Sequence, residues 1–116
     1  MGGSATGVVV GLALVVAGAL TVWLAWLGSQ RKLPPNGVAG IRLPATRRSD
    51  DAWYAAHQAA AGPLGVGGGA TAACGLGVLF AGLDTIGWVL VIIALAALTT
   101  AIGLATTVAL RAANEA

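Results

Sequence analysis

The sequence predicts an all-α integral membrane protein with three transmembrane helices and one short cytoplasmic interfacial helix. Of its 116 residues, 58% are hydrophobic and only 9% are charged, whereas about a quarter of the residues are charged in ordinary soluble domains. The apolar residues gather in three long runs without charge, and five of the six Lys and Arg residues lie between the first run and the second. We therefore treat residues 1–116 as a single membrane domain.

The three apolar runs predict transmembrane helices at residues 7–27, 64–82 and 86–110. As a helix, the first run would be about 30 Å long, which matches the hydrocarbon core of a bilayer. Trp23 and Trp26 near its end fit the aromatic belt at the membrane surface. The second run is rich in Gly and Ala, which let neighbouring helices approach closely. Only Leu83 to Thr85 separate it from the third run, so these two helices should form an antiparallel hairpin.

The polar segment at residues 28–63 is expected to begin as an irregular loop, because Pro34 and Pro35 cannot continue a helix. Ser49 is a good N-cap residue for a helix that follows it. Asp50 and Asp51 would lie in the first turn of this helix, where the helix dipole favours negative charge.

This helix should run from about Asp50 to Ala61 and end at Gly62-Pro63. Trp53 and His57 are four residues apart and would share one face with Ala56 and Ala60. A short, Ala-rich helix with two aromatic residues, Trp53 and Tyr54, near its start is typical of a helix lying along the membrane surface.

The distribution of charge predicts the orientation. The basic residues of the loop are Arg31, Lys32, Arg42, Arg47 and Arg48. A sixth, Arg111, follows the third run, and the hairpin connection carries none. The positive-inside rule therefore places the loop and the C-terminus in the cytoplasm and the N-terminus outside.

The loop also carries a pattern of residues that resembles a known family. The pattern comprises Pro35-Asn36, Gly40-Ile41-Arg42, Pro44, Thr46, Ser49-Asp50-Asp51, Trp53 and His57. It resembles the signature of the SdpI family, small bacterial integral membrane proteins named for immunity to a toxic peptide. The resemblance implies a multi-pass protein of the bacterial cell membrane, of toxin-immunity or signalling type. It also implies a cytoplasmic loop that holds a partner at the membrane.

Arg42 has two interpretations. In the first it is an intramolecular clamp, pairing with Asp50, Asp51 or backbone carbonyls through its planar guanidinium. In the second it forms an anion site with Arg47 and Arg48 at the start of the helix, for a lipid headgroup or an acidic group of a partner. Arg47 and Arg48 are also expected to fix the topology and to touch anionic lipid.

Metal binding and catalysis are not expected. His57 has neither a second histidine nor a suitably spaced carboxylate beside it, so a hydrogen bond to the loop, for example to Asn36, is the better interpretation. Asn36 itself is most simply a turn residue. The sequence offers no nucleophile with a base and an acid, and it implies no cofactor and no nucleic-acid partner.

Two functions remain open. The first is an SdpI-like immunity or signalling protein whose loop residues contact a partner or a lipid headgroup. These residues are Asn36, Gly40, Arg42, Pro44, Thr46, Arg47, Arg48, Trp53 and His57. The second is a small accessory subunit of a larger membrane complex, packing through its Gly and Ala faces. The expected partners are membrane lipids and either a membrane protein or further copies of the chain.

Overall fold

The computed structural model describes residues 2–116, which form three long helices: α1 (Gly2–Ser29), α2 (Asp50–Ala81) and α3 (Thr85–Glu115). The described part of the chain contains no strand. Each helix is long and apolar enough to cross a membrane, and the molecule is an elongated bundle of 52 × 20 × 20 Å. The chain is thus an all-α, multi-pass membrane protein, as the sequence predicted.

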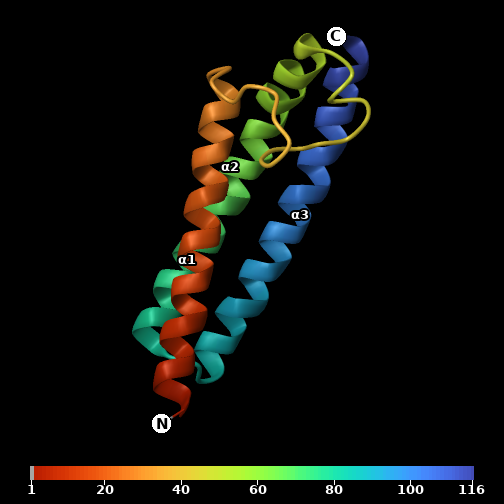
Figure 1. Cartoon of the computed structure of the whole chain (residues 1–116). Helices are drawn as coiled ribbons and strands as arrows, with labels where there is room; N and C mark the ends of the chain where they lie inside the picture. The colour runs from red at the N-terminus through yellow and green to blue at the C-terminus, as the bar shows by residue number, and fades with distance from the viewer. Residues whose placement is uncertain (1) are drawn as a thin grey trace.

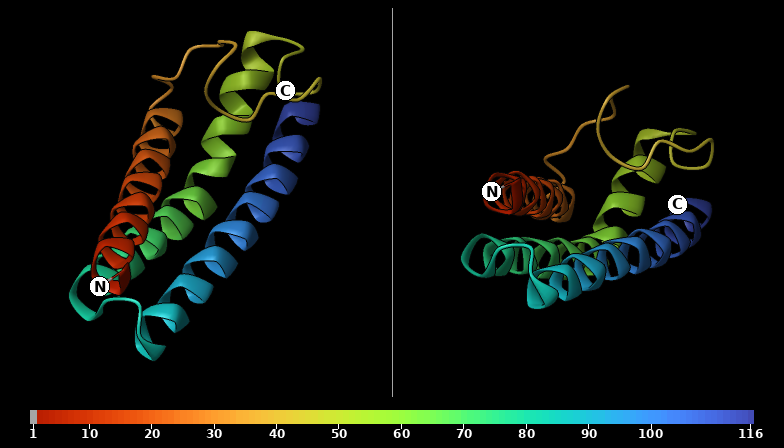
Figure 2. Two further views of the ribbon diagram at one scale, coloured as in Figure 1. Left: turned by 60° about the horizontal axis from the view of Figure 1, so that its bottom comes forward. Right: turned by 90° about the horizontal axis from the view of Figure 1, so that it is seen from below.

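The central helix of the bundle is α2, against which both α1 and α3 pack (Figure 1). The loop at residues 30–49 and the C-terminus lie at one end of the bundle, and the start of α1 lies at the other end beside the α2–α3 connection. Towards the loop end, α1 and α3 diverge (Figures 1 and 2).

Glycines bring α1 and α2 into close contact. A Cβ atom on Gly18 would lie 2.4 Å from Gly68 O and 2.4 Å from Ala72 N. One on Gly75 would lie 2.7 Å from Val15 N, again a backbone atom. Backbone atoms of a helix cannot move aside as a side chain can, so these positions admit only glycine at this helix separation.

The interfacial helix predicted at Asp50–Ala61 is not a separate element. The helix that Ser49 caps, accepting a hydrogen bond from Ala52 N, continues through Pro63 to Ala81. The predicted break at Gly62-Pro63 is therefore wrong. A proline inside a helix removes one hydrogen bond and favours a bend, and membrane helices tolerate this where neighbours support them. Both views in Figure 2 show α2 changing direction along its length.

The face predicted to lie along the membrane surface packs instead inside the protein. Trp53, Ala56 and Ala60 are fully buried, and His57 is 5% exposed. The Ala-rich part of this face packs against α3 in one cluster of buried residues, which comprises Ala52, Ala56, Ala60, Ala105, Ala109 and Ala113. This packing explains why the first turns of α2 align with the bundle.

The predicted α2–α3 hairpin is confirmed. Gly82, with φ 74°, ends α2, and its N–H donates to Val78 O. Asp84 caps α3 by accepting a hydrogen bond of 2.9 Å from Gly87 N. The helices extend beyond the predicted spans, and the loop shortens to residues 30–49.

Candidate functional site

The loop is held on α2 by Trp53 and His57, one helical turn apart. The buried indole Nε1 of Trp53 donates to Leu33 O at 2.8 Å. Ile41 N donates to His57 Nε2 at 2.9 Å, and His57 Nδ1 lies 2.7 Å from Trp53 O. The two rings are in contact, with centroids 4.3 Å apart. These two side chains therefore fix the loop at both Leu33 and Ile41.

These contacts define the protonation state of His57. Its Nε2 accepts a hydrogen from Ile41 and cannot carry one, whereas its Nδ1 faces a carbonyl oxygen and must donate. The ring is therefore neutral, with its proton on Nδ1. Both nitrogens are used within the protein, so His57 has no atom left to bind a metal ion. The partner of His57 in the loop is Ile41, not Asn36.

Gly40 allows the loop to lie directly on these rings. Its φ is +105°, a conformation that residues with a Cβ rarely adopt. A Cβ there would lie 2.6 Å from His57 Nε2 and 3.3 Å from Trp53 Cη2. The glycine is therefore required both by its backbone conformation and by the lack of space.

Asn36 and Thr46 stabilise the loop internally. Asn36 Oδ1 accepts hydrogen bonds from Val38 N at 2.8 Å and Ala39 N at 2.7 Å, which is the turn role expected for it. The buried Thr46 hydroxyl bonds Ile41 O at 2.6 Å and accepts from Leu43 N at 3.0 Å. Pro44 is exposed within the turn that Thr46 closes. None of these bonds leads outside the loop, so both residues shape it.

The intramolecular clamp is Arg48 and not Arg42. Arg42 is exposed, and within residues 2–116 its guanidinium makes no hydrogen bond to Asp50, Asp51 or a carbonyl. Arg48 instead donates to Ala113 O and, at 3.3 Å, to Ala116 O at the end of α3. The final carbonyls of a helix carry partial negative charge, so a cation is favourable there. The loop is thereby joined to α3 as well as to α2.

A polar pocket of about 360 Å³ lies between the loop and the start of α2. It is lined by Pro35, Asn36, Arg47, Arg48, Ser49, Asp50 and Trp53. Two arginines of the predicted anion site therefore meet at the predicted helix start. Arg42 does not line this pocket, and the Asp50 carboxylate offsets part of its positive charge.

Residues 32–107 match the family model described as the SdpI/YfhL protein family. This match covers nearly all of the loop, the whole of α2 and most of α3. The chain belongs to the SdpI/YfhL family. Comparisons with curated proteins and with solved structures give no match.

The sequence did not predict one contact at the start of this loop, between Arg31 and Tyr54. Arg31, with φ 56°, occupies the left-handed position after α1 that glycine usually takes. Lys32 N donates to Leu27 O and Arg31 N to Gly28 O, which completes a Schellman motif. The Arg31 guanidinium lies 4.6 Å from the centre of the Tyr54 ring. The end of α1 is thus joined to α2 by a cation–π contact.

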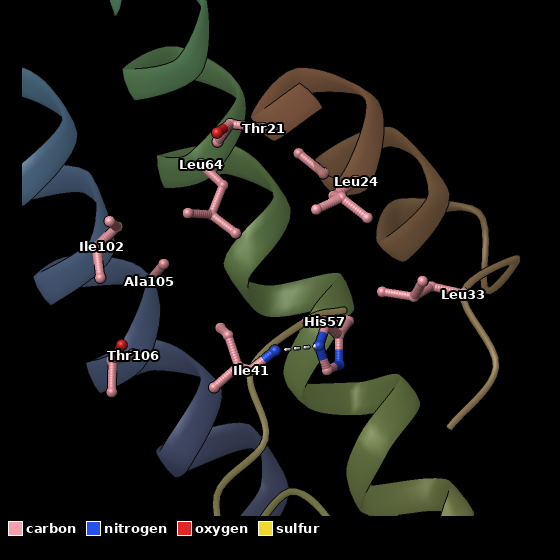
Figure 3. A pocket seen from close by; sticks show the side chains of 11 residues that line it. Thr21, Leu24, Leu33, Ile41, His57, Leu64, Ile102, Ala105 and Thr106 are labelled. Carbon is pink, nitrogen blue, oxygen red and sulfur yellow. Dashed lines mark hydrogen bonds between the residues drawn. The ribbon is translucent and has the colours of Figure 1, made fainter. Parts of the chain in front are cut away.

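A second, apolar cavity of about 290 Å³ lies on the inner side of the loop, between the three helices. Figure 3 shows its lining side chains, with Leu24 from α1, Leu64 from α2 and Ile41 from the loop pointing towards the same space. His57 lies at its edge and bonds Ile41 N (Figure 3). The loop of this family member thus separates a polar pocket from an apolar one.

Proposed function

We propose that this SdpI-family protein is of the toxin-immunity or signalling type, and that its loop binds an anionic group in the cytoplasm. One observation carries the proposal, namely how the motif residues divide their tasks. Trp53, His57 and Gly40 hold the loop against α2, whereas Arg42 and Arg47 are exposed and form none of the side-chain hydrogen bonds found within residues 2–116.

A fixed loop favours binding because a ligand need not order it. Association otherwise carries a cost of about 0.5–1.5 kcal/mol for each flexible side chain that becomes immobile, and more for an unordered loop. Arginine suits phosphate and carboxylate groups because its planar fork forms two parallel hydrogen bonds. We therefore propose that Arg42 and Arg47 contact either an acidic group of a protein partner or the phosphate of an anionic lipid.

The orientation belongs to the same proposal. The five basic residues of the loop and Arg111 all lie at the end of the bundle that carries the C-terminus. The positive-inside rule supports a cytoplasmic location for this end, in a plasma membrane. A reporter fused after Ala116 should then be active in the cytoplasm, and an exterior signal would overturn this orientation.

The binding proposal can be tested with a double variant, Arg42→Ala with Arg47→Ala. Arg111→Ala is a control that removes a cation from the same end of the bundle but from another helix. Protein purified in mild detergent would be analysed by native mass spectrometry for bound protein and for added phosphatidylglycerol against phosphatidylcholine. We expect the double variant, and not the control, to lose the protein partner or the preference for phosphatidylglycerol. If the double variant keeps the protein partner and the preference for phosphatidylglycerol as fully as the control does, the proposal is refuted.

A second function, that of an accessory subunit in a larger complex, is favoured by one observation. A groove of about 640 Å³ lies between α2 and α3, lined by small residues that include Gly67, Ala97 and Ala101. One turn of a helix about 10 Å wide occupies roughly 420 Å³, so the groove has room for part of a helix from another protein. Under this proposal Ala96→Leu, at an exposed position that lines the groove, would release the larger complex, and retention of that complex would count against it.

A further inference from the structure

The apolar cavity on the inner side of the loop differs in chemistry from the polar pocket. It is lined by Thr21, Leu24, Ala25, Leu33, Gly40, Ile41, His57, Leu64, Ile102, Ala105 and Thr106. No lining residue carries a formal charge when His57 is neutral. The cavity therefore offers apolar contact and no ion pair.

Two of the three polar side chains at this cavity, Thr21 and His57, already have partners inside the protein. Thr21 Oγ1 donates to Ala17 O at 2.7 Å, and both nitrogens of His57 are engaged. Across the described residues, every buried side-chain nitrogen or oxygen has a hydrogen-bond partner. A polar ligand would have to give up its hydration for little more than the Thr106 hydroxyl, which lines the cavity without a hydrogen bond within residues 2–116, and this costs free energy. The lining therefore favours an occupant that is apolar along most of its length.

The size of the cavity excludes a helix. A single helical turn about 10 Å wide occupies roughly 420 Å³, more than the 290 Å³ present. An apolar cavity of about 150 Å³ holds one benzene molecule, so this volume corresponds to roughly a dozen carbon atoms. A thin hydrocarbon chain fits these limits, and a packed segment of protein does not.

The cavity lies between α1 and α3, which diverge towards this end of the bundle (Figures 1 and 2). Its walls come from both helices, with Leu24 on α1 and Ile102 on α3. Ile102 is 51% exposed, and Leu20, one turn before Leu24 on α1, is 52% exposed. In a membrane protein, apolar side chains exposed to this extent face lipid. The nearest supply of apolar chains is thus the bilayer itself.

We propose that the acyl chain of a bilayer phospholipid inserts between α1 and α3 and fills this cavity below the loop. The chain would contact Leu24, Ile41 and Leu64, and would support the loop from the side opposite the polar pocket. This site uses apolar burial and does not depend on Arg42 or Arg47. The test of this lipid site is therefore independent of the test for anion binding by the loop.

The test uses the full chain in nanodiscs of phosphatidylcholine that include a fraction with a photoactivatable diazirine in one acyl chain. The crosslinked positions would be mapped by mass spectrometry. Thr106→Phe adds a large side chain to the cavity wall. Thr107→Phe adds the same group to an exposed position on the next residue and is the matched control.

We expect crosslinks to Leu24, Ile41 or Leu64 in the unmodified protein and in Thr107→Phe, and their loss in Thr106→Phe. Leu24→Trp fills the cavity from α1 and should give the same loss, which guards against a folding defect of one variant. Labelling restricted to outward residues such as Ile92, or cavity labelling that persists in both filled variants, would overturn the proposal. So would a bound apolar peptide found in the cavity in place of lipid.

Discussion

Replacing Gly40 with alanine should detach the loop from α2 while the helix bundle remains folded. The added Cβ would lie 2.6 Å from His57 Nε2, at the nitrogen that accepts the hydrogen bond from Ile41. The backbone at φ +105° would also become strained. The two effects act on the same contact, because relieving the clash requires the loop to move away from the ring.

The loss of docking free energy in Gly40→Ala is the sum of the backbone strain and the lost hydrogen bond. Strained backbone of this kind costs about 1–3 kcal/mol, and loss of a hydrogen bond costs about 1 kcal/mol more. The docked loop should therefore be destabilised by at least about 2 kcal/mol, which corresponds to a change of roughly thirty-fold in the docking equilibrium. The matched control is Gly37→Ala in the same loop, where a Cβ would meet no atom within 4 Å.

Hydrogen exchange measured by mass spectrometry on loop peptides reports the docking equilibrium directly, because the Ile41 amide exchanges only when it leaves His57. In Gly40→Ala the exchange of the peptide containing Ile41 should be about thirty times faster or more, by the free energy above. In Gly37→Ala it should be unchanged or slightly slower. Similar exchange rates in the two variants would refute the role given to Gly40.

Substitutions at two further contact sites, Gly18 and Arg48, test the helix contacts. Gly18→Ala should lower the stability of the bundle to detergent-induced unfolding by about 1–3 kcal/mol, because the new Cβ meets backbone atoms at 2.4 Å. Gly103→Ala, where the added Cβ meets nothing within 4 Å, should be neutral or stabilising, so equal destabilisation by the two would contradict the close packing. Arg48→Ala should weaken the end of α3 by about 1–2 kcal/mol, with Arg48→Lys intermediate. Faster amide exchange confined to the last turn of α3 and to the loop would show this, and unchanged exchange there would exclude the clamp.

The features predicted correctly from the sequence depend on local signals. The helix begins after Ser49 because a serine followed by two acidic residues satisfies the first turn, whatever lies around it. The short connection was predicted at residues 83–85 and lies at residues 82–84 in the structure. A connection of this length leaves the next helix no option but to return. The shared face of Trp53 and His57 follows from helical periodicity alone.

The features that were missed depend on tertiary contacts. Pro63 ends many helices, but here the buried face of α2 packs against α3 on one side and α1 on the other, which stabilises the bent helix beyond its lost hydrogen bond. Nothing in the sequence distinguishes Arg42 from Arg48 as the arginine that clamps the loop. Only the position of the end of α3 determines which of them finds carbonyl oxygens. The apolar cavity depends likewise on the divergence of α1 and α3, to which no single residue contributes a recognisable signal.

The central position of α2 has a mechanical consequence. The loop is attached to its first turns, both outer helices pack along it, and its last turn enters the hairpin at the far end of the bundle. With 32 residues at about 1.5 Å each, it is a continuous rod of roughly 48 Å. Force applied to the loop through Trp53 and His57 therefore reaches the opposite end of the bundle through one helix, and Pro63 is the point at which that rod bends most easily.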